Sequence, residues 1–213
     1  MGLLISFEGT EGCGKSTQIS LLAERLRALG RTVKMVREPG GTPIGEEIRH
    51  TLKHSAANAA MTPEAELLLM NASRAQLVRE VIRPALSGGN IVLCDRFYDS
   101  TVAYQGYGRG LDLEVIRAVI DIAVGETRPR LTLLLRVPAE VSQARVAARR
   151  ATALPARDRM EEADGAFFER VARGYERVAG EEPNRVHSID AVGPVELISD
   201  EIWNKVQPLL REG

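Results

Sequence analysis

A glycine-rich segment near the N-terminus has the spacing of a phosphate-binding loop. It fits the pattern G-x-x-x-x-G-K-[ST]. An apolar run at residues 3–7 precedes it and a helical pattern at 17–29 follows it, which is the context that the motif requires. The glycines let successive backbone N–H groups face an anion, and the helix N-terminus adds partial positive charge. The predicted binding residues for a nucleoside triphosphate are Gly9, Thr10, Glu11, Gly12, Cys13, Gly14, Lys15 and Ser16.

Three polar residues are predicted to act on the phosphates. Lys15 should reach the β- and γ-phosphates, and the hydroxyl of Ser16 should bind Mg²⁺. Asp95 follows the apolar run at 91–94, where a carboxylate can hold Mg²⁺ directly or through water. Ser16 and Asp95 are therefore the predicted metal ligands. The alternative for Asp95 is a strand-terminal residue that caps a turn.

Short apolar runs alternate with helical patterns along the chain, which predicts an α/β fold with a parallel sheet covered on both faces. The resulting prediction is a P-loop NTPase fold in one domain, 1–213, with a small lid at about 149–160. Ligands of such sheets bind beyond the carboxyl ends of the strands. The predicted strands are 3–7, 32–36, 91–94, 131–137 and 185–189, and the predicted helices are 17–29, 44–52, 63–86, 113–124, 138–148, 160–178 and 195–210.

Composition narrows the choice of partners. The 28 Lys and Arg residues against 29 Asp and Glu residues give a net charge of −1, so no basic field predicts binding to nucleic acid or to a membrane surface. No apolar run is long enough to span a bilayer. Both cysteines fall inside other motifs, which favours the reducing cytoplasm over a disulfide-bonded protein.

The loop alone leaves GTPases, motor ATPases and small kinases open. The segment most similar to the base-reading motif of GTPases, residues 204–207, has Gln207 in place of the required Asp. A ring ATPase usually needs a longer chain. A small kinase fits the length.

Several separated segments resemble the bacterial form of thymidylate kinase. They are Leu-Cys-Asp-Arg-Phe-Tyr-Asp-Ser-Thr-Val-Ala-Tyr-Gln at 93–105, Arg-Glu-Pro-Gly-Gly-Thr at 37–42, Arg74 within 72–76, and Gly-Tyr-Gly-Arg-Gly at 106–110. The resemblance runs through nearly the whole chain. It implies transfer of a phosphoryl group from ATP to dTMP, with Mg²⁺, usually in a homodimer.

The resemblance also implies an acceptor site. Arg96 would bridge the acceptor phosphate and the moving group, and Tyr104 would crowd a 2′-hydroxyl and so select deoxyribose. Many relatives carry Phe where this chain has Met70, whose sulfur can lie against a ring. Arg74 and Arg37 have structural alternatives, as a solvated helix residue and a salt-bridge partner. The implied acceptor residues are Glu11, Arg37, Glu38, Pro39, Met70, Arg74, Arg96, Ser100, Thr101, Tyr104 and Gln105.

A basic segment at 145–159 suits a lid that closes over the triphosphate and excludes water, although a solvated loop would look similar. The variable positions of the phosphate loop hold no Arg, so the chain resembles the type in which the lid supplies the catalytic arginine. The candidates are Arg150, Arg157 and Arg159, and Arg145 or Arg149 would stack on adenine. Glu11 would approach the acceptor sugar or the metal, or would fix the loop through hydrogen bonds.

Two other functions remain as alternatives. A deoxynucleoside kinase has a neutral acceptor and needs fewer arginines than Arg37, Arg74 and Arg96 provide. A non-catalytic nucleotide-binding switch would not need Lys15, Ser16 and Asp95 together.

Overall fold

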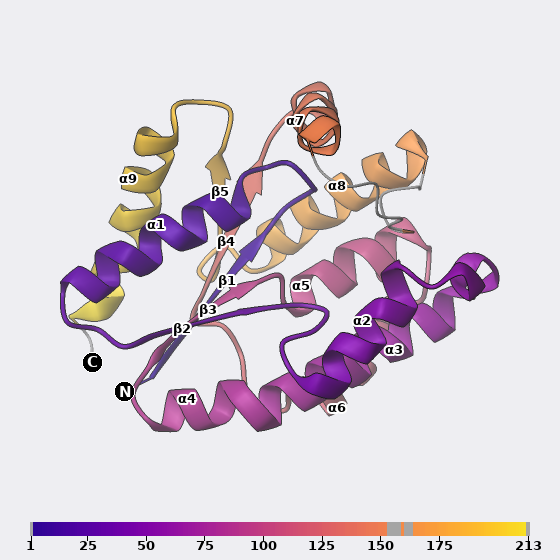
Figure 1. Ribbon diagram of the computed structural model, residues 1–213, viewed down its shortest axis with the longest axis horizontal. Helices are drawn as coiled ribbons and strands as arrows, with labels where there is room; N and C mark the ends of the chain where they lie inside the picture. The colour runs from indigo at the N-terminus through magenta and orange to yellow at the C-terminus, as the bar shows by residue number, and fades with distance from the viewer. Residues whose placement is uncertain (1, 153–158, 160–163, 212–213) are drawn as a thin grey trace.

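The structure, a computed structural model, describes residues 2–152, 159 and 164–211 (Figure 1). Its centre is a five-stranded sheet in the order β2-β3-β1-β4-β5, and every neighbouring pair is parallel. The predicted parallel sheet is confirmed. The strands are β1 (Leu3–Glu8), β2 (Val33–Arg37), β3 (Ile91–Asp95), β4 (Leu131–Arg136) and β5 (Val186–Asp190).

Helices cover both faces of the sheet (Figure 1). Ile5 and Phe7 of β1 belong to a core shared with α1 and α9, whereas Leu4 belongs to a core shared with α3 and α6. This alternation is the period of two that a strand covered on both faces requires. The α-helices are α1 (Lys15–Ala28), α2 (Pro43–Lys53), α3 (Pro63–Leu77), α4 (Arg83–Ser87), α5 (Tyr98–Thr101), α6 (Leu113–Val124), α7 (Ala139–Thr152), α8 (Gly165–Glu181) and α9 (Val195–Val206).

Two helix starts follow from threonine–proline pairs. Thr42 and Thr62 accept hydrogen bonds from the N–H groups of Gly45 and Ala65, so they cap α2 and α3. Pro43 and Pro63 occupy first-turn positions, where the missing N–H costs nothing. Short 3₁₀ helices add Ala56–Ala60 after α2 and Gln207–Leu210 after α9.

Several boundaries differ from the prediction. The helix expected at 63–86 contains a π-helical stretch, Val78–Ile82, just before Pro84, which has no N–H to continue the ordinary hydrogen-bond ladder. The helix expected to end at Ala148 continues to Thr152 as α7, so Ala151 and Thr152 do not belong to an irregular loop. Most of the predicted lid, 153–158 with Arg157, and residue 160 lie outside the described residues.

One helical segment of the structure was not predicted from the sequence pattern. The chain after β3 forms α5 and then a π-helix, Val102–Gly108. Its Thr, Val, Tyr and Gly residues have weak helix propensity, so tertiary packing must supply the stability. The packing partner is α8, where Gly174 lies so close that an added Cβ would sit 2.9 Å from Ala103 Cα and from Tyr107 Cβ.

Within the described residues, every helix is too short or too polar to cross a lipid bilayer.

Candidate functional site

Every strand of the sheet ends in a charged residue at the same edge: Glu8, Arg37, Asp95, Arg136 and Asp190. Parallel strands bring these ends together, which concentrates ionisable side chains there. Two cavities lie against residues of this edge. We call them the large cavity, about 750 Å³, and the small cavity, about 50 Å³. Both are lined by Glu11, Glu38, Lys53 and Arg96, so the two cavities adjoin.

The phosphate loop forms one wall of the large cavity. Gly9, Gly12 and Gly14 have positive φ angles of 133°, 72° and 94°, which favour glycine. The ammonium group of Lys15 donates to the carbonyl oxygens of Gly9 at 3.2 Å and Thr10 at 2.9 Å. The carbonyl oxygens of Gly9 and Thr10 thus hold Lys15, and neither of these two residues lines the large cavity. The loop residues that line it are Glu11, Gly12, Cys13, Gly14, Lys15 and Ser16.

The two predicted metal ligands are adjacent. Ser16 Oγ donates a hydrogen bond to Asp95 Oδ2 at 3.1 Å, and both residues line the large cavity. Hard oxygen donors of this kind suit Mg²⁺, which keeps several waters and binds one or two protein groups together with substrate phosphates. Among the described residues no group of three or more His, Cys, Asp or Glu side chains could hold a metal by itself. The site therefore fits a Mg²⁺ ion that arrives with a nucleotide.

Arg96 is fixed between the two cavities. Its φ of 68° is unusual for a residue other than glycine. Its guanidinium donates to Glu11 at 3.0 Å, to Tyr175 at 3.1 Å and to Ser100 at 3.3 Å. Burial alone would raise the pKa of Glu11, but Arg96, Lys15 and Lys53 lower it to about 2. Glu11 is therefore ionised and braces Arg96, which supports its predicted role in fixing the loop.

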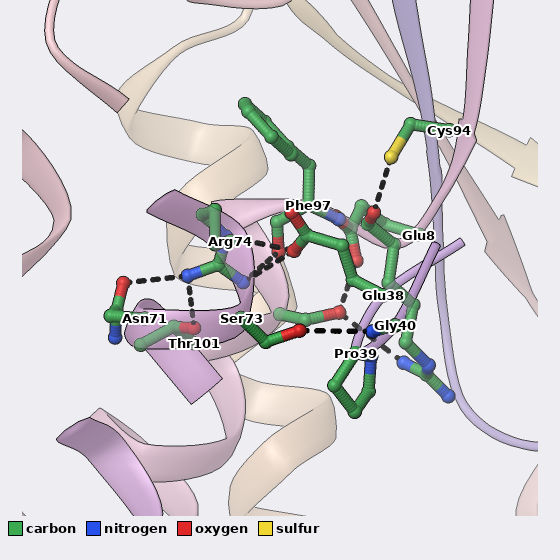
Figure 2. Close-up of polar contacts among 12 residues, drawn as sticks. Glu8, Glu38, Pro39, Gly40, Asn71, Ser73, Arg74, Cys94, Phe97 and Thr101 are labelled. Atoms are coloured by element: carbon green, nitrogen blue, oxygen red, sulfur yellow. Dashed lines mark hydrogen bonds and ion pairs between the residues drawn. The ribbon is translucent and has the colours of Figure 1, made fainter. Parts of the chain in front are cut away.

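Arg74 is buried and lines the small cavity, and Figure 2 shows its polar contacts. Its Nε donates to Glu38 at 2.8 Å, its Nη1 donates to Asn71 at 2.8 Å and to Thr101 at 2.9 Å, and its Nη2 donates to the carbonyl of Phe97 at 3.2 Å. The side chain is 3% exposed, so the solvated alternative is wrong. The nitrogens of its guanidinium are therefore all occupied by partners within the protein.

Glu38, the ion-pair partner of Arg74, also lines the small cavity. Burial raises the pKa of Glu38, which Arg74 opposes. Oε1 of Glu38 is buried with no hydrogen-bond partner among the described residues.

The small cavity brings together the residues of the predicted acceptor site except Arg37. Arg37 lines the large cavity instead, and its guanidinium donates to both carboxylate oxygens of Glu46, at 3.2 and 3.0 Å. The structure thus supports the salt-bridge alternative for Arg37. The predicted residues that line the small cavity are Glu11, Glu38, Pro39, Met70, Arg74, Arg96, Ser100, Thr101, Tyr104 and Gln105.

The basic residues of the predicted lid are divided between places. Arg145 and Arg149 line the large cavity, where Arg145 donates to the carbonyl of Ala191 at 3.1 Å. Arg159 lines neither cavity, and its guanidinium contacts Glu66 and the carbonyl of Met61. Arg150 belongs to α7, and its side chain, like all of Arg157, lies outside the described part of the chain.

Sequence reasoning missed several residues of the site. Arg49 and Lys53 from the last turns of α2 line the large cavity, and Lys53 lines the small cavity as well. Their spacing of four places both on one face of a helix, a signal available in the sequence. Glu8 was missed because its carboxyl group reads as the end of a buried strand.

Comparison with known proteins decides the family. The profile of the family described as thymidylate kinase matches residues 7–202. A thymidylate kinase of Syntrophotalea carbinolica is 48% identical over 204 residues, covering 95% of this chain and 94% of the relative. A thymidylate kinase of Geotalea uraniireducens is 48% identical over 214 residues, with both chains fully covered. The chain belongs to the thymidylate kinase family.

A solved structure agrees with this assignment. The crystal structure of thymidylate kinase from Ehrlichia chaffeensis matches with a TM-score of 0.76 and 31% identity, over 97% of this chain and 98% of the other. The P-loop NTPase fold is therefore confirmed. Neither a deoxynucleoside kinase nor a non-catalytic switch is favoured by these members of the thymidylate kinase family.

Proposed function

We propose that this chain transfers the γ-phosphoryl group of ATP to dTMP and yields ADP and dTDP. The observation that carries the proposal is the meeting of two cavities at Arg96 and Glu11, one walled by the phosphate loop and the other by the acceptor residues. ATP would occupy the large cavity and dTMP the small one. An oxygen of the acceptor phosphate would attack the γ-phosphorus, and the bond from that phosphorus to the β-bridging oxygen would break.

Positive groups must offset the repulsion between two anionic nucleotides. Lys15 would leave the carbonyls of the loop and bind the β- and γ-phosphates. Arg96 would bridge the acceptor phosphate and the moving group from its place between the cavities. Ser16 and Asp95 would hold Mg²⁺, which supplies neutralising charge on the phosphates when bound. Arg150, Arg157 and Arg159 remain the candidates for the arginine that completes the site.

The acceptor end follows from the small cavity. Tyr104 lines it, and the ring packs edge-on against Phe167 and Tyr175, with centroids 6.0 and 6.2 Å away. A ring held from two sides cannot yield to an added 2′-hydroxyl, which supports its role in selecting deoxyribose. Arg74, Thr101 and Gln105 would face the base from the same wall, and Met70 would lie against it.

We further propose a cytoplasmic homodimer, with no nucleic acid or membrane partner. Apolar side chains are exposed on two helices that pack together: Leu68 of α3 is 58% exposed, and Val115 and Ile122 of α6 are 53% and 75% exposed. Val115 and Ile122 are seven residues apart, so they share one side of α6. A second copy of the chain would cover them.

A coupled assay that follows ADP release tests the reaction. With ATP and Mg²⁺ present, dTMP should be phosphorylated and thymidine should not. Lys15→Ala should lower kcat/KM by several hundredfold, because removing one group that stabilises transferring charge costs about 3–4 kcal/mol. Turnover of thymidine without turnover of dTMP would contradict the proposal. A Lys15→Ala variant that keeps the wild-type kcat/KM would also contradict it.

A further inference from the structure

Glu8 is a buried carboxyl group that the proposed reaction does not use directly. It is the last residue of β1, the central strand, and is 0% exposed. It lines neither cavity, so it is not placed to touch either nucleotide. A carboxyl group in such a position is costly to bury and needs hydrogen bonds to offset the loss of water.

One carboxylate oxygen holds the backbone next to Arg96. Oε1 of Glu8 accepts the N–H of Phe97 at 2.7 Å, and the N–H of Arg96 donates to the carbonyl of Phe7 at 2.9 Å. The ends of β1 and β3 are thus joined on both sides of the left-handed turn at Arg96. A non-glycine residue in that region persists only where its surroundings enforce it.

The other carboxylate oxygen of Glu8 forms a triangle with the hydroxyl groups of Ser100 and Tyr175. Oε2 of Glu8 lies 2.5 Å from Ser100 Oγ and 3.0 Å from the hydroxyl of Tyr175, and the two hydroxyls lie 2.8 Å apart. Nη1 of Arg96 donates to both hydroxyls, at 3.3 and 3.1 Å. Each hydroxyl therefore has the carboxyl group on one side and the guanidinium on the other.

We propose that Glu8 and Tyr175 are positioning residues that fix the backbone and the guanidinium of Arg96 for phosphoryl transfer. The inference rests on the proposed function, since Arg96 is the group that would meet the acceptor phosphate. A carboxyl group sets the direction of the two hydroxyls: they donate to Glu8 and present their lone pairs to Arg96. Without it, the hydroxyl protons would be free to turn toward the guanidinium and repel it.

The directions of the two hydroxyls require the ionised form of Glu8. Both hydroxyl protons then point to Oε2, whereas a proton on Glu8 would take up one of these contacts and turn one hydroxyl toward the other. Burial, together with the nearby charge of Asp99, raises the pKa of Glu8 to about 7, although the Ser100 hydrogen bond and Arg96 oppose the rise.

A double-mutant cycle tests the proposal on the full chain. Glu8→Gln keeps one oxygen for the N–H of Phe97 but turns an NH₂ group toward the hydroxyls, so their direction reverses. We expect Glu8→Gln to lower kcat/KM for dTMP by about tenfold or more, since small misplacements of a reacting group cost up to about 100-fold. KM for ATP should change by less than about twofold, because Glu8 does not line the large cavity.

The decisive measurement is the effect of Glu8→Gln on kcat/KM in a chain that already carries Arg96→Lys. If Glu8 acts through Arg96, Glu8→Gln should lower kcat/KM there by less than about twofold, because the interaction between Glu8 and the guanidinium of Arg96 is already lost. The matched control is Arg37→Lys, because Arg37 lies at the same sheet edge, pairs with Glu46 and makes no hydrogen bond to the triangle among the described residues. Combined with Arg37→Lys, the effect of Glu8→Gln should be undiminished.

Each outcome decides between the claims. Equal losses from Glu8→Gln with and without Arg96→Lys would overturn the positioning role while leaving the proposed function intact. A wild-type chain that does not phosphorylate dTMP would overturn the proposed function itself. Should Glu8→Gln fail to fold, as shown by circular dichroism, Tyr175→Phe goes through the same cycle. That change removes a single hydroxyl, and an additive result there would equally overturn the proposal.

Discussion

Among the described residues, the guanidinium of Arg96 donates hydrogen bonds to one charged side chain and two neutral ones, and it lies 5.1 Å from the centre of the Tyr104 ring. Glu11 offsets part of its charge, whereas the hydroxyls of Ser100 and Tyr175 orient it without neutralising it. On the proposed function, an incoming phosphate would replace Glu11 while the hydroxyls keep their hydrogen bonds to Arg96. The arrangement leaves a cation ready for an anion at the boundary of the two cavities, in surroundings where charge interactions are stronger than in water.

Glu8 gives a prediction for the dependence of stability on pH. Its pKa of about 7 in the folded chain exceeds the ordinary value of 4.5, because of burial and Asp99. Between these values the folded state holds a proton that the unfolded state releases, so stability falls as pH rises through this window. The difference in free energy of unfolding between wild type and Glu8→Gln should fall by about 3 kcal/mol from pH 4.5 to 8.

Urea denaturation of both proteins at several pH values measures that difference. Among the described residues, the charged and titratable groups that interact with Glu8 are Arg96, Asp99, Tyr175 and Cys94, and both proteins keep all four. A difference that is the same at every pH would mean that Glu8 titrates as it does in the unfolded chain.

Tyr104 gives a prediction about the sugar. Tyr104→Ala should lower the preference for dTMP over ribothymidine monophosphate by about tenfold or more, since a steric contact of this size commonly sets such ratios. Tyr104→Phe keeps the ring and should keep the preference. Competition between the two nucleotides in one assay, below the melting temperature of each variant, measures the ratio. An unchanged preference in Tyr104→Ala would assign the ring to core packing alone.

Sequence reasoning reached these side chains unevenly. Motif spacing predicted Lys15, Ser16 and Asp95 at one edge, because the loop and the strand ends carry local patterns, and the family resemblance implied Arg96 beside them. Sequence reasoning did not predict that Arg74 would donate its hydrogen bonds to Glu38, Asn71 and Thr101, since Glu38 and Thr101 come from segments far from Arg74 in the sequence. Long-range pairing leaves no local pattern to read.

The elements show the same division. Helices with an apolar stripe and a Thr-Pro start, such as α2 and α3, follow from local sequence. The helical segment Tyr98–Gly108 does not, because α8 stabilises it from 57 or more residues away along the chain. That segment carries Ser100, Thr101, Tyr104 and Gln105, so the acceptor site depends on a helix that propensity disfavours.

Two glycines of α8 test this dependence. Gly174→Ala would put its Cβ 2.9 Å from Ala103 Cα and from Tyr107 Cβ, and overpacking of this kind costs about 1–3 kcal/mol. Gly180 lies in the same helix with no heavy atom within 4 Å of an added Cβ, so Gly180→Ala should stabilise the protein by about 0.5–1 kcal/mol. Thermal unfolding compares the two variants. Equal effects would show that α8 does not pack tightly on the acceptor segment.

The whole molecule exposes apolar side chains where a second copy could bind. Wild type should sediment at about twice its mass of 23.3 kDa. Ile122→Glu should give monomers, because a charge would be buried between the copies. Leu197→Glu is the matched control, since Leu197 is 65% exposed on α9 in the opposite layer, and it should leave the dimer intact. A monomeric wild type would refute the predicted homodimer.

The two cavities together make the central claim, that ATP and dTMP are held end to end with their phosphates meeting at Arg96. A compound that joins adenosine to thymidine through a chain of phosphates measures this directly by titration calorimetry. We expect it to bind at least about 100-fold more tightly than ATP or dTMP alone, as tethered ligands do when both sites are reached, and to be displaced by either nucleotide. A compound that binds no more tightly than the tighter-binding of ATP and dTMP, or that is displaced by only one of them, would contradict the account.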